Sequence, residues 1–504
     1  MSVSPLRALG LFAPVVFIAQ AAQADLSAQD VWSDWKDYMG STGYAVTASE
    51  AQSGKTLTVS DIQMTMNVEG ETMALGLGAI DFVENGDGTV NVVLPAAFPM
   101  EFDITADGES MKGKLIYRHD GTPMVVSGDM SKMTYDYKAA TASFSLDGLE
   151  IDGASVPADV AAFTMTLTDL ANTTVMEIGE QRAYSQTLTT SGLDYTFMFK
   201  DPESDDSGTF TGALTDLNFD GTMVVPTVED PTDIAALMKA GLAYDADITF
   251  GGGNTSINGV DGSDNFALQT TSQGGKANIQ VSPAGFGYDF TQTDATVNVM
   301  GSQIPFPIAL SMAELGMNMT MPLMKSEEEQ DFALGLALRD FSVPEMLWGL
   351  IDPTGELPHD PATLVLDLTG KGKLAFDLTD EAQVAALDAG EAAPGELNAL
   401  NLNELLLSVA GAELTGSGAF TFDNSDLESF DGMPAPEGEA NLKLVGANGL
   451  IDKLIGMGLI SEDDAMGARM MMGMFTVSAG DDVVTSKIEV NEEGHVLANG
   501  QRLK

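Results

Sequence analysis

The stretch Met346–Leu378, MLWGLIDPTGELPHDPATLVLDLTGKGKLAFDL, organises the rest of the chain. It begins with a short apolar turn and then places Pro353, Pro358 and Pro361 within nine residues. Proline fixes φ and removes a backbone N–H, so Ile351–Pro361 is predicted to be neither helix nor central strand. We interpret this segment as a stiff connector that joins two β-rich parts of the chain.

Alternation of apolar and polar residues dominates on both sides of this connector. Thr363–Leu378 is predicted to be one long strand, and Thr56–Val68 another, with a change of phase between Val59 and Ile62 that indicates a bulge. Short Asp-Gly turns between such runs favour antiparallel neighbours. The predicted fold is therefore β-dominated α+β, with long antiparallel sheets that form an extended or half-barrel body and a few packed helices.

Helical periodicity is confined to a few segments. They are Leu26–Tyr38, Glu229–Leu242, Asp380–Ala389 and a helical hairpin within Asn448–Phe475. The first contains Trp32 and Trp35 on one side and is predicted to plug the end of a sheet. In contrast, the polar, glycine-rich run Gly251–Asn265 is predicted to be a flexible surface loop.

The N-terminal residues 1–24 have the order of a secretory signal peptide. A basic residue, Arg7, precedes the apolar run Ala8–Ala19 and then Ala22-Gln23-Ala24, so cleavage is expected before Asp25. The apolar run is too short to cross a bilayer, and no later segment is long enough for a transmembrane span. We therefore expect a periplasmic protein.

At 504 residues the chain is long for one compact core. We divide the part after the signal peptide into three. They are an N-terminal β-rich part with a terminal helix (25–242), a middle β-rich part (243–343), and the proline connector with long strands and the C-terminal helical hairpin (344–504).

The charge is strongly acidic, because 75 Asp and Glu face only 22 Lys and Arg, for a net −53. Such a charge repels polyanions, so nucleic acid is not an expected partner, and neither are anionic lipid headgroups. The chain contains no cysteine, which excludes disulfides, thiolate metal sites and a lipid-anchored cysteine.

No catalytic constellation stands out. The three histidines, His119, His359 and His495, are far apart and match no metal-binding spacing, and no Gly-x-Ser-x-Gly elbow occurs. We therefore predict no catalytic residue, no cofactor and no metal, and a non-enzymatic protein. An enzyme remains an alternative only if polar residues converge on His359 or His495.

The 29 methionines are the most unusual feature of the composition. Met64 and Met66 alternate along one predicted strand, as do Met317, Met319 and Met321 along another, so each set points to one face. Methionine is a flexible core filler, and a face of this kind also adapts to apolar ligands such as lipid or an acyl chain. A third interpretation is Cu(I) handling, because thioethers are soft ligands.

Two further alternatives remain. One is a periplasmic scaffold that binds envelope proteins without a ligand. The other is an outer-membrane barrel, which is disfavoured because aromatic residues make up only 7% of the chain and it ends Gln-Arg-Leu-Lys.

Several stretches resemble the bacterial domain of unknown function 2125 family. The matching residues are Leu347-Trp348, Ile351-Asp352-Pro353, Leu357-Pro358, Asp360-Pro361, Leu364–Gly370, Ala410–Gly418 and Gly494–Arg502. The resemblance covers most of the chain after the signal peptide. It implies an exported envelope protein and brings no catalytic residues. The order of strands and the C-terminal helical hairpin are also loosely similar to AsmA-like envelope proteins, at the level of the fold alone.

Overall fold

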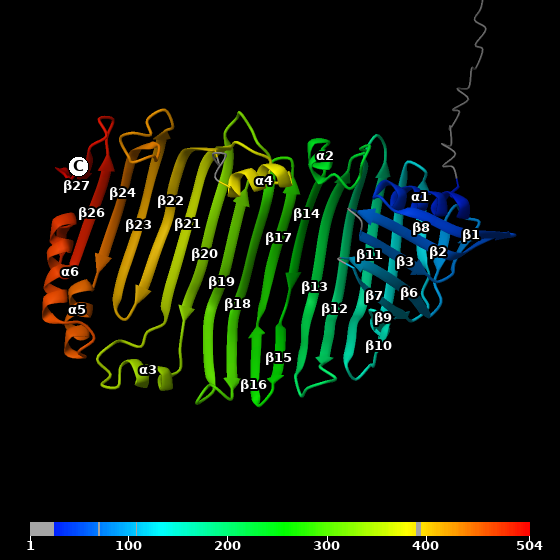
Figure 1. Cartoon of the computed structure of the whole chain (residues 1–504), viewed down its shortest axis with the longest axis horizontal. Coiled ribbons are helices and arrows are strands. Elements are labelled where there is room, and N and C mark those ends of the chain that lie inside the picture. Colours follow the sequence, from blue (N-terminus) through cyan, green and yellow to red (C-terminus); the bar gives the residue numbers. More distant parts are fainter. Residues whose placement is uncertain (1–24, 69–70, 107, 390–394) are drawn as a thin grey trace, which may run out of the picture.

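The computed structural model describes residues 25–68, 71–106, 108–389 and 395–504. The predicted signal peptide, residues 1–24, lies outside the described residues. The described residues contain 28 strands that form a single antiparallel sheet, and the molecule is longest across the strands (Figure 1). This confirms the β-dominated α+β fold class.

The first half of the sheet is built from short strands that follow one another and then from long ones. They are β1 (Ala45–Ser53), β2 (Thr56–Val68), β3 (Glu71–Leu77), β4 (Ile80–Glu84), β5 (Val90–Val93), β6 (Ala97–Ala106), β7 (Glu109–His119), β8 (Met124–Asp129), β9 (Lys132–Ile151), β10 (Ala154–Val156), β11 (Ala161–Ile178), β12 (Arg182–Lys200) and β13 (Ser207–Val225).

The second half continues with the same antiparallel pairing to the C-terminus. Its strands are β14 (Ala243–Phe250), β15 (Gly253–Asp261), β16 (Asp264–Ser272), β17 (Gly274–Ser282), β18 (Gly285–Gly301), β19 (Ile308–Met321), β20 (Gln330–Phe341), β21 (Ala362–Leu374), β22 (Gly395–Val409), β23 (Ala412–Asp423), β24 (Ala435–Val445), β25 (Val477–Gly480), β26 (Val483–Val490), β27 (Val496–Ala498) and β28 (Gln501–Arg502).

Among the described residues, every helix except the one at Glu345–Ile351 lies where the sequence periodicity places it, with shifted ends. They are α1 (Ala28–Ser41), α2 (Ile234–Lys239), α3 (Glu345–Ile351), α4 (Glu381–Asp388), α5 (Ala447–Gly456) and α6 (Glu462–Phe475). Ser27 and Ser461 form capping boxes that begin α1 and α6. In the described part of the chain, no helix combines the length and the apolar character needed to cross a membrane.

Two local predictions are wrong. The expected apolar turn at the start of the connector is the helix α3, which includes Ile351, because the first proline that ends it comes only at Pro353. The expected flexible loop Gly251–Asn265 contains all of β15 and the start of β16, and these strands pair from Gly253 with Ser272 to Asp261 with Asp264. Its alternating small polar residues lie on the solvated side of a strand rather than in a loop.

A line of skipped pairs crosses most of the sheet. Where the pairing skips, five aspartates have left-handed φ angles between 46° and 52°, namely Asp61, Asp169, Asp216, Asp294 and Asp340. The pairing of β12 with β13 skips one residue on each strand at Asp216, and the pairing of β18 with β19 does the same at Asp294. Aspartate tolerates this conformation better than most residues. The register shifts by one residue at Asp61 and at Asp340, so these two are β-bulges, whereas at the other three aspartates one residue on each strand is left unpaired and the register is kept. The shift at Asp61 confirms the predicted bulge between Val59 and Ile62.

The tightest packing lies at the N-terminal end, where α1 rests on the sheet (Figure 1). Trp32 and Val31 of α1 are completely buried, together with Phe82 of β4 and Met133 of β9. The Trp32 and Phe82 rings lie 6.0 Å apart. This confirms the prediction that the first helix plugs one end of a sheet.

Candidate functional site

One face of the sheet is apolar over most of its length, and we call it the apolar face. Because cross-strand partners point to the same side, the register defines its members. One row runs across the strands from β12 to β24, and it comprises Leu188, Phe219, Ile248, Ala277, Phe290, Met317, Leu336, Leu366, Leu405, Gly416 and Leu442. It contains no charged side chain.

The opposite side, which we call the polar face, differs completely. The adjacent row on that side comprises Thr187, Asp220, Asp247, Asn278, Asp289, Asn318, Gly335, Asp367 and Glu404. An antiparallel sheet with one wet side and one dry side normally packs its dry side on a core. In the part of the chain that the structure describes, the dry side has a complete cover only at its ends.

Apolar side chains in the middle of the sheet are consequently exposed. Met317 and Leu336, which are direct partners across β19 and β20, are each 39% exposed. The same is true, to a similar degree, of Phe197, Phe199, Phe210, Phe266, Leu315, Leu334, Leu364 and Leu407 on the same face. An uncovered patch of this extent marks a surface that binds something apolar.

Helices cover the two ends of the apolar face. At the N-terminal end, α1 buries its tryptophan there. At the C-terminal end, α6 lies over β23, β24 and β26 and leaves a cavity of about 450 Å³. Leu442 and Ile488 line this cavity from the sheet, and Met472 and Phe475 line it from α6.

The upper rim, the strand ends that α2 and α4 join, is also covered (Figure 1). Ala246 on the apolar face is fully buried, while its neighbours Asp245 and Asp247 on the polar face are exposed. Lys239 at the end of α2 forms an ion pair of 3.1 Å with Asp377, which follows β21. Residues 375–380 therefore run along the upper rim and connect the strands next to α2 with the end of β21.

The hydrogen bonds of Asp377 explain why this tie is stable. Its carboxylate is almost completely buried and accepts a hydrogen bond of 2.9 Å from the backbone N–H of Lys325. Burial opposes ionisation, but this hydrogen bond and the Lys239 ammonium outweigh it and lower the pKa of Asp377.

The five predicted methionines all belong to the apolar face but form two separate groups. Met64 and Met66 pair with Leu75 and Met73 on β3 and lie in the N-terminal part. The second group follows β19, many strands away. Its cross-strand neighbours are Phe286, Tyr288, Phe290, Leu334 and Leu336. None of these is a thioether or an imidazole, so the second group lies in apolar surroundings.

The histidines lie far apart and take part in local structure. His119 binds the backbone at Pro95 and Gly121, and His495 lies 3.6 Å from Glu493. His359 stacks on Trp348 with 4.3 Å between ring centroids. Within the described ranges, no group of three or more potential metal-ligating side chains is close enough to hold an ion.

His359 belongs to the folded connector. The buried carboxylate of Asp352 accepts hydrogen bonds from the N–H groups of Glu356 and Leu357 at 3.0 and 2.6 Å. Burial opposes its ionisation, but these hydrogen bonds outweigh that effect and lower the pKa of Asp352. The carboxylate thus holds the loop in its conformation. His359 links the end of the loop to the start of α3, because its Nδ1 lies 3.1 Å from the Glu345 carboxylate.

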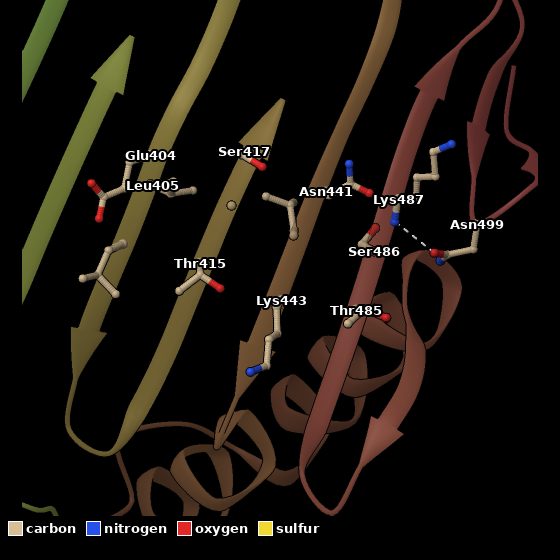
Figure 2. A pocket seen from close by; sticks show the side chains of 13 residues that line it. Glu404, Leu405, Thr415, Ser417, Asn441, Lys443, Thr485, Ser486, Lys487 and Asn499 are labelled. Carbon is tan, nitrogen blue, oxygen red and sulfur yellow. Dashed lines mark hydrogen bonds between the residues drawn. The ribbon is translucent and has the colours of Figure 1, made fainter. Parts of the chain in front are cut away.

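A shallow depression of about 510 Å³ lies on the polar face above Gly416 (Figure 2). Thr415, Ser417, Lys443 and Lys487 point into it, and the Lys487 N–H donates to Asn499. The Lys487 ammonium already pairs with Glu439 at 2.7 Å. The depression offers no activated nucleophile or base, so we regard it as a groove between side chains.

An ion pair lies beneath α1. Arg182 of β12 donates a hydrogen bond of 2.7 Å to Asp34 of α1, whose side chain is 2% exposed. Burial raises the pKa of Asp34, and the guanidinium only partly opposes this. Burial also raises the pKa of the adjacent Tyr184 to about 12. These polar groups lie on the side of the sheet that is otherwise apolar, and they position the helix.

Comparison with protein families gives one match. The family described as "Uncharacterized protein conserved in bacteria (DUF2125)" matches residues 219–497, more than half of the chain. The chain belongs to the DUF2125 family. The resemblance seen in the sequence is thereby confirmed. A comparison with curated proteins gave no match.

The DUF2125 match begins within β13 and ends within β27, so it contains most of the exposed part of the apolar face. Our sequence reasoning selected the methionines of this face and missed its leucines. The signal was present, because Leu334, Leu336 and Leu338 alternate, as do Leu364 and Leu366.

Proposed function

We propose that this DUF2125 protein binds the acyl chains of lipids along the exposed part of the apolar face. The observation that carries the proposal is the continuous apolar row from Leu188 to Leu442, which the described residues leave without a complete cover between the helices at its two ends. All strands there are paired on both sides, so a ligand needs no hydrogen-bonding groups. Hydrocarbon meets that requirement.

Charge argues against the obvious protein occupant, a second copy of the chain. Each copy carries a net charge of −53, so two copies repel each other strongly at low ionic strength. A neutral hydrocarbon chain meets no such repulsion. The proposed setting is the periplasm, which rests on the signal-peptide pattern, and the AsmA-like similarity of the sequence agrees with a role in the envelope.

Cu(I) handling has weaker support. Met317, Met319 and Met321 are spaced along one strand, and their cross-strand neighbours supply carbon atoms rather than further soft ligands. Scaffolding without a ligand leaves the exposed face unexplained. A single experiment distinguishes both alternatives from lipid binding.

The experiment is native mass spectrometry of the protein purified gently from its own envelope, before and after organic extraction. We expect near-stoichiometric lipid that extraction removes. The variant Met317→Asp/Leu336→Asp places two charges in the middle of the row and is expected to lower the occupancy at least ~10-fold, because a carboxylate against hydrocarbon is costly.

Thr320→Asp is the matched control, since Thr320 lies on β19 but points to the polar face. It is expected to retain the lipid. A clean mass without lipid for the wild-type protein, or equal occupancy in the double variant, would remove the proposal. Bound copper without lipid would favour the metal alternative.

A further inference from the structure

The two rims of the apolar face differ. The upper rim is covered by α2 and by the segment that ties Asp377 to Lys239. The lower rim, formed by the strand ends next to α3 and next to the turns at 201–206 and 262–263, has no comparable cover in the described part of the chain (Figure 1). A chain-like ligand therefore has its open access at the lower rim.

Exposed apolar side chains gather on α3 at this rim. Met346, Leu350 and Ile351 are 55%, 68% and 54% exposed. They add to the rim residues Leu364 and Leu407, which are direct partners on the apolar face. The apolar surface of α3 thus lies at the open end of the strands that carry the proposed acyl-chain site.

The α3 segment is held in place rather than loosely attached. Trp348, on the same helix, stacks on His359, and Asp352 fixes the following loop through its two backbone hydrogen bonds. Pro358 of that loop lies against Gly411 in the β22–β23 turn, so that a Cβ atom added to Gly411 would lie only 3.0 Å from the Pro358 Cγ. The helix α3 therefore presents Met346 and Leu350 from a base that the loop holds in place.

The apolar side chains of α3 and the acidic residues around them indicate which kind of partner this rim can bind. The strands β20 and β21 next to α3 are paired on both sides, so the partner must offer apolar contact rather than a strand edge. The surroundings are acidic, with Glu345, Glu356 and Asp360 nearby in a chain of charge −53, so an anionic partner is repelled. A bilayer with zwitterionic headgroups satisfies both conditions, and it is where acyl chains are found.

We propose that α3 docks the lower rim on the surface of a zwitterionic bilayer, so that acyl chains pass between the bilayer and the apolar face. Short apolar segments of this kind insert shallowly into the boundary between headgroups and acyl chains. The proposal rests on the proposed function for its purpose, but docking is measured independently of lipid occupancy.

The test is flotation of the full chain with phosphatidylcholine vesicles. We expect the wild-type protein to float with them and Met346→Ser/Leu350→Ser to bind at least ~10-fold more weakly, since two inserting side chains are lost. Vesicles rich in phosphatidylglycerol are expected to bind the wild-type protein less. Circular dichroism confirms that the variant is folded.

Ile234→Ser is the matched control. Ile234 is 52% exposed on α2, at the opposite rim, and the variant is expected to float like the wild-type protein. No flotation of the wild-type protein, unchanged flotation of the α3 variant, or equal loss in Ile234→Ser overturns the docking proposal. Native mass spectrometry of the same samples separates the two proposals, because the α3 variant is expected to keep its purified lipid.

Discussion

The N-terminal part of the sheet and the part from β13 onward solve the same problem in different ways. Both alternate apolar and polar residues and both have one dry side. In the first part α1 covers that side, and Trp32 is completely buried. In the second part Met317 remains 39% exposed. The comparison teaches that alternation determines which side is dry, whereas a covering element determines whether that side becomes a core.

The family match follows the same division. It begins at residue 219 and leaves out α1 and the strands that α1 covers. The matched range therefore contains most of the exposed apolar side chains, together with the C-terminal end that α6 covers. The helix α1 covers the dry side of the N-terminal strands permanently, whereas under our proposal an acyl chain would cover the exposed part of the apolar face only when it is bound.

The largest predicted effect tests the covered part. Trp32→Ala removes a fully buried side chain from the contact between α1 and the sheet, and large aromatic truncations in a core cost about 3–5 kcal/mol. Urea unfolding, followed by the fluorescence of the remaining tryptophans, measures the change. An effect below about 1 kcal/mol would show that α1 is not a true core element, and the comparison would fail.

A smaller effect is predicted at the upper rim. Asp377→Ala leaves the Lys325 N–H without its acceptor and Lys239 without its partner, and such losses cost about 1–3 kcal/mol. The control is Lys132→Met, which breaks an ion pair whose side chains are 57% and 60% exposed and is expected to cost less than about 0.5 kcal/mol. Equal thermal shifts for both variants would mean that the rim is not tied at Asp377.

Without bound lipid, the exposed part of the apolar face is predicted to tolerate truncation of its side chains with little loss of stability. Leu336→Ala removes a side chain that is already 39% exposed, so its cost in lipid-free protein is about 1 kcal/mol or less. In lipid-loaded protein the same change removes contacts with the ligand, so the difference in Tm between variant and wild type grows. If the difference is the same with and without lipid, Leu336 does not contact the ligand.

The smallest predicted effect is in the pH dependence. Because burial raises the pKa of Asp34, the folded state holds its proton more tightly than the unfolded state, so this group adds stability as the pH falls through its folded pKa. Asp377 has a lowered pKa, so its contribution is present above the ordinary value of 3.8 and is lost as the pH falls through its folded pKa.

Acidification below pH 3.8 is therefore expected to loosen the upper rim before the α1 region. Hydrogen exchange, corrected for intrinsic rates, measures this order segment by segment. In Asp34→Asn the acid-dependent gain at α1 is expected to disappear. If α1 lost its protection at a higher pH than the upper rim, the opposite roles assigned to Asp34 and Asp377 would be contradicted.

Much of the fold was predictable from the sequence, because alternation and turn chemistry are local. The phase change between Val59 and Ile62 located a bulge, and the helical hairpin was visible from its spacing. The division of the chain at residues 242 and 343 stays a prediction. The loop predicted at Gly251–Asn265 failed because asparagine also occupies the wet side of a strand, and glycine its dry side, when neighbours on both sides pair with it.

The candidate site was predictable only in part. Alternating methionines indicated an apolar face, but nothing local shows whether a helix far away in the chain covers it. The tie between Lys239 and Asp377 joins residues more than a hundred positions apart and has no sequence signal. Apart from Asp61, the left-handed aspartates of the line were missed for the same reason, since only the register with neighbouring strands reveals them.

The line of skipped pairs has a mechanical consequence. Where pairing skips at Asp216 and again at Asp294, the regular ladder of the sheet is interrupted. Other backbone hydrogen bonds bridge the interruption, since the Thr215 N–H donates to the Gly252 carbonyl at 2.9 Å and the Gln273 N–H donates to the Thr293 carbonyl at 3.0 Å. The parts of the sheet on either side of the line are therefore fastened together, and we expect them to move as one plate.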